Sequence, residues 1–402
     1  MTRLRALLAN EAGGGRGHVT TLAAAARALG SDVDCIAAIG RLTYASDLAA
    51  LHQPVRQAPR LARGRTQART FALRGSATWG DVLAEIGLDN PDKLRRGLAF
   101  WRRLIVAEDI SILVADFAPL ALRAALGLRD EGWAIRIISL GTGYTSPPSG
   151  LDHFPVFLPD HDRITRSEAA TLDALNLVAG GMRLDPLPRL SALYDVDQAL
   201  ATTFAFLDPY NLRPPTDRVA PLSPAARDLA DGTGIFVYFS TAELTDPALV
   251  DALCALPQPR RGYLPSATPD VADRLRASGM EILDRPASPD EIAARSRLIV
   301  HAAPHGTLCM AALAGLAQVG IPQHLEQLYN ARRAEAQGIL RIGTRGDAGL
   351  RDLIASAYAD PGLHARCRDL ARNLRQGHPS DPVAGLAARL QPEISAARQA
   401  LA

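Results

Sequence analysis

A turn between an apolar run and a helix marks the place where this sequence is best suited to bind an anion. Residues 298–300 predict a buried strand, residues 301–306 a turn, and Thr307 the opening of a helix. The first turn of a helix carries backbone N–H groups that have no partner inside the helix, and the helix dipole favours negative charge there. We therefore predict a phosphate site in the second half of the chain.

A histidine and an aspartate in the first half are suited to proton transfer. His18 follows the glycine-rich turn 13–17, and Asp116 ends an apolar run that begins at residue 110. Both positions fall at the carboxyl ends of predicted strands, the edge at which an open α/β sheet binds ligands. A histidine can accept a proton near neutral pH, and a carboxylate can fix its tautomer. The structural alternative is that His18 only caps a helix and Asp116 only ends a strand.

Length and composition point to a globular protein of two domains. The chain has 402 residues, and single cores stop growing at about 250–300. The formal net charge of +2 offers no field that would favour a nucleic acid partner. The four cysteines lie far apart without metal-like spacing, which favours a reducing compartment and no metal site. No segment reaches the ~20 apolar residues of a membrane span, so we expect a cytoplasmic protein.

Strands and helices alternate along most of the chain, which predicts an α/β fold. Residues 208–234 are rich in Pro, Asp and Gly and form the best linker candidate. A strand is predicted just before them, over 203–207. We divide the chain into an amino-terminal domain, a carboxy-terminal domain and a last helix, over residues 1–215, 216–380 and 381–402.

A dinucleotide-binding role is disfavoured. That fold has an acidic residue at the end of its second strand, whereas the second strand here, over 33–38, is followed by Ile39 and Gly40.

Three segments together resemble the GT-B glycosyltransferases of the UDP-glycosyltransferase (family 1) type, closest to the bacterial macrolide-type branch. They are the glycine turn ending at His18, the segment 114–119 around Asp116, and residues 299–338. The resemblance implies two Rossmann-like doubly wound domains that face each other across a cleft. It further implies that the first domain binds the acceptor, the second binds the nucleotide-sugar, and the last helix crosses back to the first domain.

The resemblance also assigns residues. His18 falls at the family's general base and Asp116 at the carboxylate that orients it. Glu326 and Gln327 match the acid–glutamine pair that binds sugar hydroxyls, for which a solvent-facing helix start is the structural alternative. The residues expected to bind the nucleotide-sugar are Gly15, Gly17, Ser240, Thr241, His305, Gly306, Thr307, Glu326 and Gln327.

The phosphate turn departs from the family pattern His-Gly-Gly-x-Gly-Thr. Alignment on Gly306 puts Ala302 at the histidine and Ala303 and Pro304 at the two glycines. Proline has no N–H, so one expected donor to the diphosphate is lost. His301 and His305 flank the change, and either could replace the missing imidazole. Elsewhere, the family's ribose-binding acid is replaced by Met310 and its stacking tryptophan by Arg285.

The long irregular segment 141–160 supplies the expected acceptor wall, with Tyr144 and Phe154 as binding residues. Its apolar character favours a hydrophobic small molecule, with a lipid or a peptide as alternatives.

We therefore expect an inverting glycosyltransferase. It would use a UDP- or dTDP-sugar as co-substrate, with no cofactor and no metal. The main alternative is a catalytically impaired, glycosyltransferase-like helper or binding protein, which the altered turn supports. A third hypothesis keeps the fold and changes the reaction to nucleotide-sugar hydrolysis or epimerisation. Whether the chain forms a homo-oligomer stays open.

Overall fold

The chain folds into two compact units. The computed structural model describes residues 4–13, 15–51, 54–62, 77–158, 160 and 167–401. The first unit comprises Met1–Leu222 together with Val383–Ala402, and the second comprises Ser223–Pro382. Within the described residues, no helix is long and apolar enough to cross a membrane.

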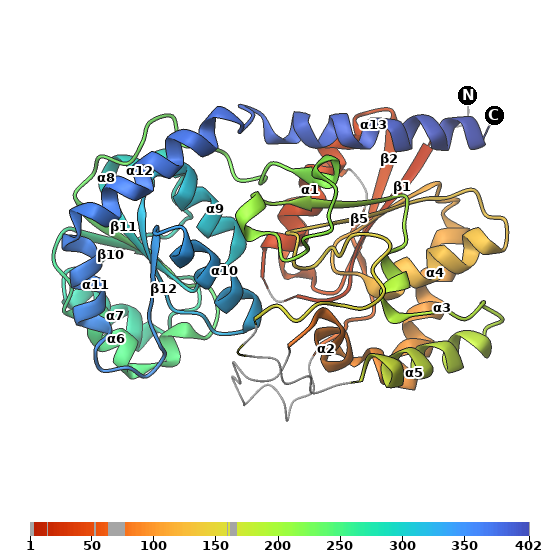
Figure 1. Cartoon of the computed structure of the whole chain (residues 1–402), viewed down its shortest axis with the longest axis horizontal. Helices are drawn as coiled ribbons and strands as arrows, with labels where there is room; N and C mark the ends of the chain where they lie inside the picture. The colour runs from red at the N-terminus through yellow and green to blue at the C-terminus, as the bar shows by residue number, and fades with distance from the viewer. Residues whose placement is uncertain are drawn as a thin grey trace. The chain divides into compact units, whose positions relative to one another are not determined.

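A parallel sheet forms the centre of the first unit, in the order β3-β2-β1-β4-β5-β6-β7 (Figure 1). Its strands are β1 (Leu4–Asn10), β2 (Val33–Ile39), β3 (Arg56–Gln57), β4 (Ile112–Ala115), β5 (Arg136–Gly141), β6 (Gln198–Thr202) and β7 (Arg218–Val219). The central strands are continuous apolar runs because both faces of a parallel sheet are covered. The order reverses between β1 and β4, so the carboxyl ends of these two strands form a topological switch point.

Helices cover this sheet. They are α1 (Gly17–Leu29), α2 (Trp79–Leu83), α3 (Pro91–Ala107), α4 (Pro119–Asp130) and α5 (Glu168–Gly180). Short 3₁₀ segments lie at Leu42–Leu51 and Leu190–Tyr194. Local signals explain the starts of the helices: Thr78 and Asp81 form a capping box before α2, and the Asn90 side chain caps α3.

The last helix, α13 (Pro382–Ala400), packs on the first unit (Figure 1). One face of this helix carries apolar residues at helical spacing, and they join the core formed by α1, β1, β2 and β4. These residues are Leu386, Leu390, Ile394 and Ala397. Glu393 on the same helix forms an ion pair with Arg136 of β5, with 2.6 Å between the carboxylate and the guanidinium.

The second unit repeats the architecture with the sheet order β10-β9-β8-β11-β12-β13. Its strands are β8 (Gly234–Tyr238), β9 (Arg260–Tyr263), β10 (Glu281–Ile282), β11 (Ser296–His301), β12 (Ala317–Gly320) and β13 (Leu340–Ile342), all parallel. Its helices are α6 (Pro247–Cys254), α7 (Pro269–Ala277), α8 (Pro289–Arg295), α9 (His305–Ala314), α10 (Leu325–Ala336), α11 (Leu350–Ala359) and α12 (Pro361–Gln376). Here the switch point lies between β8 and β11.

The α/β fold with two doubly wound sheets is confirmed, but one predicted strand was wrong. Residues 203–207 do not form a strand: β6 ends at Thr202, and Ala205–Leu207 form a 3₁₀ turn. The apolar residues after β6 misled the prediction because they pack as a loop, with Phe204 stacked on Phe206. Small residues fill the true strand, whose sequence is Gln-Ala-Leu-Ala-Thr, so its apolar signal is weak.

We predict that Leu390→Ala destabilises the first unit by about 2–5 kcal/mol, because Leu390 is fully buried and truncation leaves a cavity. The chain has three tryptophans, Trp79, Trp101 and Trp133, and all belong to the first unit. Tryptophan fluorescence during urea unfolding therefore measures this unit.

Leu177→Ala is the matched control. Leu177 is 75% exposed on α5, so the same truncation should change the free energy of unfolding by less than about 0.5 kcal/mol. Equal effects of the two substitutions would contradict the packing of α13 on this core.

Candidate functional site

His18 and Asp116 meet at the switch point of the first sheet. His18 lies in the first turn of α1, directly after the loop that follows β1, and Asp116 follows β4. The Nδ1 atom of His18 is 3.0 Å from Oδ1 of Asp116. The aspartate side chain is 2% exposed, whereas the histidine side chain is 20% exposed. The buried carboxylate thus holds a partly exposed imidazole, with Nδ1 as the donor and Nε2 as the basic nitrogen.

Asn10, the last residue of β1, joins the two loops that carry this pair. Its side-chain amide donates to the carbonyl oxygens of Ala12 at 2.8 Å and Asp116 at 2.9 Å. The backbone N–H groups of Glu11 and Ala12 both donate to the carbonyl of Phe117. Phe117 itself has φ of 51°, a left-handed conformation that is uncommon outside glycine. Asn10 could not be identified from the sequence, because its role depends on the pairing of β1 with β4.

A buried carboxylate fixes the same loop to α4. Glu11 is 1% exposed, accepts the N–H of Leu120 at 2.9 Å and accepts the indole N–H of Trp101. Burial raises the pKa of Glu11 to about 8, although these hydrogen bonds oppose the shift. Glu11 therefore caps the start of α4 next to Asp116.

Gly13 packs directly on the His18 ring. Its φ is 95°, and a Cβ atom placed there would overlap Nε2 and Cδ2 of His18. Only glycine combines this backbone with this close approach. By contrast, a Cβ at Gly15 or Gly17 would meet no atom, and both residues are exposed. The predicted contact of Gly15 and Gly17 with the nucleotide-sugar stays a prediction.

A series of aromatic ring contacts connects His18 with the core of the first unit. Phe117 contacts the His18 ring at 5.8 Å between centroids and Trp79 at 4.9 Å, and Trp79 meets Tyr144 edge-on at 5.5 Å. Tyr144 is 4% exposed and Phe154, which packs on Tyr194, is 2% exposed. Both proposed acceptor residues are therefore buried in the core of the first unit. Their role in acceptor binding stays a prediction.

The turn before α9 lies at the switch point of the second sheet. Pro304 is the N-cap, makes no side-chain capping bond, and α9 begins at His305, two residues earlier than predicted. The first intrahelical bond runs from the Leu308 N–H to the Pro304 carbonyl. In the described chain the N–H groups of Gly306 and Thr307 have no partner, so they remain as donors for an anion.

Ala303 takes the conformation that a glycine would adopt more readily, with φ of 59°. Two contacts hold it there. Its N–H donates to Nδ1 of His301 at 2.9 Å, and its carbonyl accepts from the Asn330 amide at 3.4 Å. The altered turn therefore keeps a left-handed residue at this position despite the loss of glycine.

His301 is a structural residue of this turn. It is fully buried, and its Nε2 lies 3.0 Å from Oε1 of Gln318 while its Nδ1 accepts from Ala303. These contacts assign the proton to Nε2. Burial lowers the pKa of His301 to about 4, so the ring is neutral at pH 7. His301 thus cannot replace an imidazole at a phosphate, and Gln318 is its unpredicted partner.

His305 lies at the start of α9 and is 8% exposed. Its Nε2 is 3.6 Å from the sulfur of Cys309, one helical turn later. Burial lowers its pKa to about 4, which leaves a neutral ring near the helix start. A contact with phosphate would therefore be a hydrogen bond without a full positive charge.

Glu326 and Gln327 occupy the first turn of α10, which follows β12. The side-chain oxygen of Gln327 accepts the N–H of Gln323 at 2.8 Å. Its amide nitrogen has no partner in the described residues, so it remains as a donor. Glu326 is partly exposed. Both residues are at the same sheet edge as α9.

Ser240 and Thr241 follow β8, the strand on the other side of this switch point. The N–H and hydroxyl of Thr241 both bind the carboxylate of Glu243, each at 2.7 Å. Thr241 is exposed and Ser240 is partly exposed. Arg285, which replaces the expected tryptophan, is 74% exposed and pairs with Glu291 at 2.9 Å.

Among the residues that the structure describes, no three histidine, cysteine, aspartate or glutamate side chains are grouped as a metal site would require.

We predict that Gly13→Ala displaces the His18 ring, because the new methyl group would occupy the place of Nε2. The imidazole resonances of His18 in NMR spectra of histidine-labelled protein should shift, while those of the buried His301 stay in place. Gly180→Ala is the control, since a Cβ there meets no atom. An unchanged His18 resonance in Gly13→Ala would contradict this geometry.

We predict that acid destabilises the second unit through His301. Its pKa is lower in the folded state than in the unfolded chain, so unfolding takes up a proton between about pH 6.5 and pH 4, and stability falls as the pH falls through this window. Going from pH 7 to pH 5, this one residue should cost about 2 kcal/mol. His301→Gln should remove that part of the loss, as measured by urea unfolding followed by circular dichroism. His153→Gln, at an exposed position of the other unit, should leave the full loss in place.

Comparison with known proteins gives the fold. The sequence matches no family model and no curated protein sequence. Solved glycosyltransferase structures match nearly the whole chain. The spinosyn rhamnosyltransferase SpnG has 17% identity and a TM-score of 0.65 over 96% of this chain and 100% of that chain. The calicheamicin glycosyltransferase CalG4 has 16% identity and a TM-score of 0.67 over 97% and 99%.

The glycosyltransferase VinC in complex with dTDP has 14% identity and a TM-score of 0.65 over 98% of this chain and 100% of that chain. At such identities the match concerns the fold. The predicted fold is confirmed: the chain has the GT-B fold of the glycosyltransferases.

Proposed function

We propose that this protein is an inverting glycosyltransferase that moves a sugar from a nucleotide-diphosphate sugar to a hydroxyl group of an acceptor. The observation that carries the proposal is the contact between His18 and the buried Asp116 at the carboxyl edge of the first sheet. The carboxylate is buried and the imidazole remains partly exposed, as a base that meets an acceptor hydroxyl requires.

The proposed base step follows from the tautomer. Nδ1 of His18 donates to Asp116, so Nε2 is the nitrogen that takes the proton from the acceptor hydroxyl. Asp116 then stabilises the imidazolium that forms. The acceptor oxygen attacks the anomeric carbon from the face opposite the leaving group. The bond from that carbon to the diphosphate oxygen breaks, and its electron pair leaves with the nucleoside diphosphate.

The proposed leaving-group site is the start of α9. The N–H groups of Gly306 and Thr307 and the dipole of a ten-residue helix favour a diphosphate there. His305 would add a neutral hydrogen bond. Glu326 and Gln327, at the same sheet edge, would bind sugar hydroxyls.

The neighbours suggest the substrates. VinC was solved with dTDP, and SpnG with thymidine diphosphate and, separately, with spinosyn aglycone. We infer a dTDP- or UDP-sugar as donor and a hydrophobic small molecule as acceptor. Tyr144 and Phe154 belong to the aromatic layer behind that acceptor.

A helper without catalysis is the second candidate, since Pro304 removes one N–H from the turn and Ala303 replaces a glycine. Calorimetry with dTDP and UDP separates the two proposals. Absence of binding for both nucleotides would favour the helper, and sugar release without an acceptor would favour hydrolysis.

We predict that His18→Ala lowers the rate of sugar transfer by about 10²–10⁴-fold, the usual contribution of a general base. Asp116→Asn should lower it in the same direction. The measurement is product formation from dTDP- and UDP-sugars with a panel of hydrophobic acceptors.

Asp92→Asn is the matched control, because the Asp92 side chain is 80% exposed and pairs with Arg95 on the surface. Neither His18→Ala nor Asp116→Asn should change the affinity for dTDP, since the proposed diphosphate donors belong to α9. Transfer by His18→Ala at the wild-type rate would remove His18 from the mechanism.

A further inference from the structure

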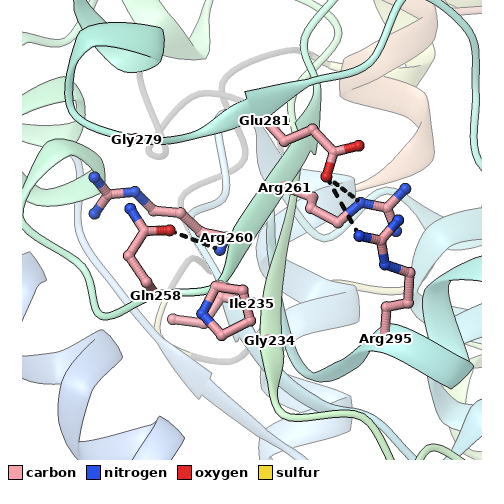
Figure 2. Close-up of a pocket in the computed structure, with 9 residues that line it drawn as sticks. Gly234, Ile235, Gln258, Arg260, Arg261, Gly279, Glu281 and Arg295 are labelled. Carbon is pink, nitrogen blue, oxygen red and sulfur yellow. Dashed lines mark hydrogen bonds and ion pairs between the residues drawn. The ribbon is translucent and has the colours of Figure 1, made fainter.

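A pocket of about 190 Å³ lies at the amino edge of the second sheet, the edge opposite to the turn before α9 (Figure 2). Gly234, Arg260 and Glu281 are the first residues of β8, β9 and β10, and Arg295 ends α8 just before β11. All four line the pocket, together with Arg261. The proposed transferase chemistry uses none of them.

Two guanidinium groups and one carboxylate form a charged cluster in this pocket. Arg261 and Arg295 both pair with the same oxygen of Glu281, at 3.1 Å and 3.5 Å. Figure 2 shows these two arginines converging on Glu281 from one side, with the guanidinium of Arg260 on the other. Arg260 donates to the carbonyl oxygens of Leu256 and Ser278 and has no carboxylate partner among the described residues. The cluster of Arg261, Arg295 and Glu281 carries a net charge of +1.

Two of these arginines are buried without full satisfaction. Arg260 is 3% exposed and Arg261 is 8% exposed. Nε of Arg260 and Nη1 of Arg261 are buried atoms that lack a hydrogen-bond partner. Burial lowers the pKa of Arg260, yet a guanidinium stays protonated in proteins. Buried charges and donors of this kind normally have a counter-ion or a ligand.

We propose that this pocket binds a small oxyanion of the phosphate class, with Arg261 and Arg295 as its ligands. Guanidinium groups match the oxygens of a phosphate in geometry and charge. An anion would balance the net +1 charge of this cluster. The pocket has room for a phosphate group.

Glu281 pairs with the two arginines that would bind the anion. Its side chain is 50% exposed, so it can turn outward when an anion arrives. This makes the proposal testable in two directions. Arg295→Gln should weaken binding of the anion, and Glu281→Gln should strengthen it, because the second change frees both arginines.

The experiment is calorimetric titration of the full chain with inorganic phosphate, at an ionic strength held constant with sodium chloride. Arg295→Gln should raise the Kd about 10–100-fold, as expected for a hydrogen bond to a charged group. Arg276→Gln is the control: Arg276 is 52% exposed, pairs with Asp273 on α7 and should leave the Kd unchanged. Both Arg295 and Glu281 are half exposed, so their variants should fold.

A further titration is made with dTDP present at saturation, because phosphate could also bind at α9. Phosphate binding that survives dTDP and responds to both substitutions supports the pocket. Binding that is abolished by dTDP, or that ignores Arg295→Gln and Glu281→Gln, overturns it. Glycerol phosphate, used in the same way, tells whether the anion enters as an ester or as free phosphate. The test does not require transferase activity.

Discussion

The side-chain amide of Asn10 is the interaction on which the first half of the candidate site depends. Parallel pairing brings the ends of β1 and β4 together, and Asn10 then ties the loop towards His18 to the turn of Asp116 by two hydrogen bonds. Gly13 lets that loop lie against the imidazole. The contact between His18 and Asp116 therefore follows from strand register and loop closure as well as from the two residues themselves.

In the second unit, a different set of residues holds the turn before α9 in place. A left-handed alanine costs on the order of 1 kcal/mol relative to glycine. The turn offsets this because the Ala303 N–H binds His301 and its carbonyl binds Asn330. Gln318 in turn fixes the histidine tautomer. A buried histidine thus supports a helix start whose N–H groups still point outward, although the glycine pattern has been lost.

The sequence was informative where apolar runs are long and punctuated by glycine or proline. It predicted the buried strand over 298–300, which lies within β11, and it placed His18 and Asp116 at one sheet edge. It could not identify Asn10 or Gln318, because polar residues at strand ends look alike until the register is known. It misplaced β6, since alanine-rich strands give little apolar signal. It also gave no sign that Tyr144 and Phe154 are core residues.

The two edges of the second sheet differ in a way that the fold does not require. At the carboxyl edge, the donors are backbone N–H groups that every doubly wound sheet offers at a helix start. At the amino edge, the donors are arginine side chains, and apolar residues of similar size would stabilise that position as well or better. Buried guanidinium groups that exceed their carboxylate partners therefore need an explanation beyond folding. A bound oxyanion supplies one for Arg261, whose buried Nη1 has no hydrogen-bond partner among the described residues.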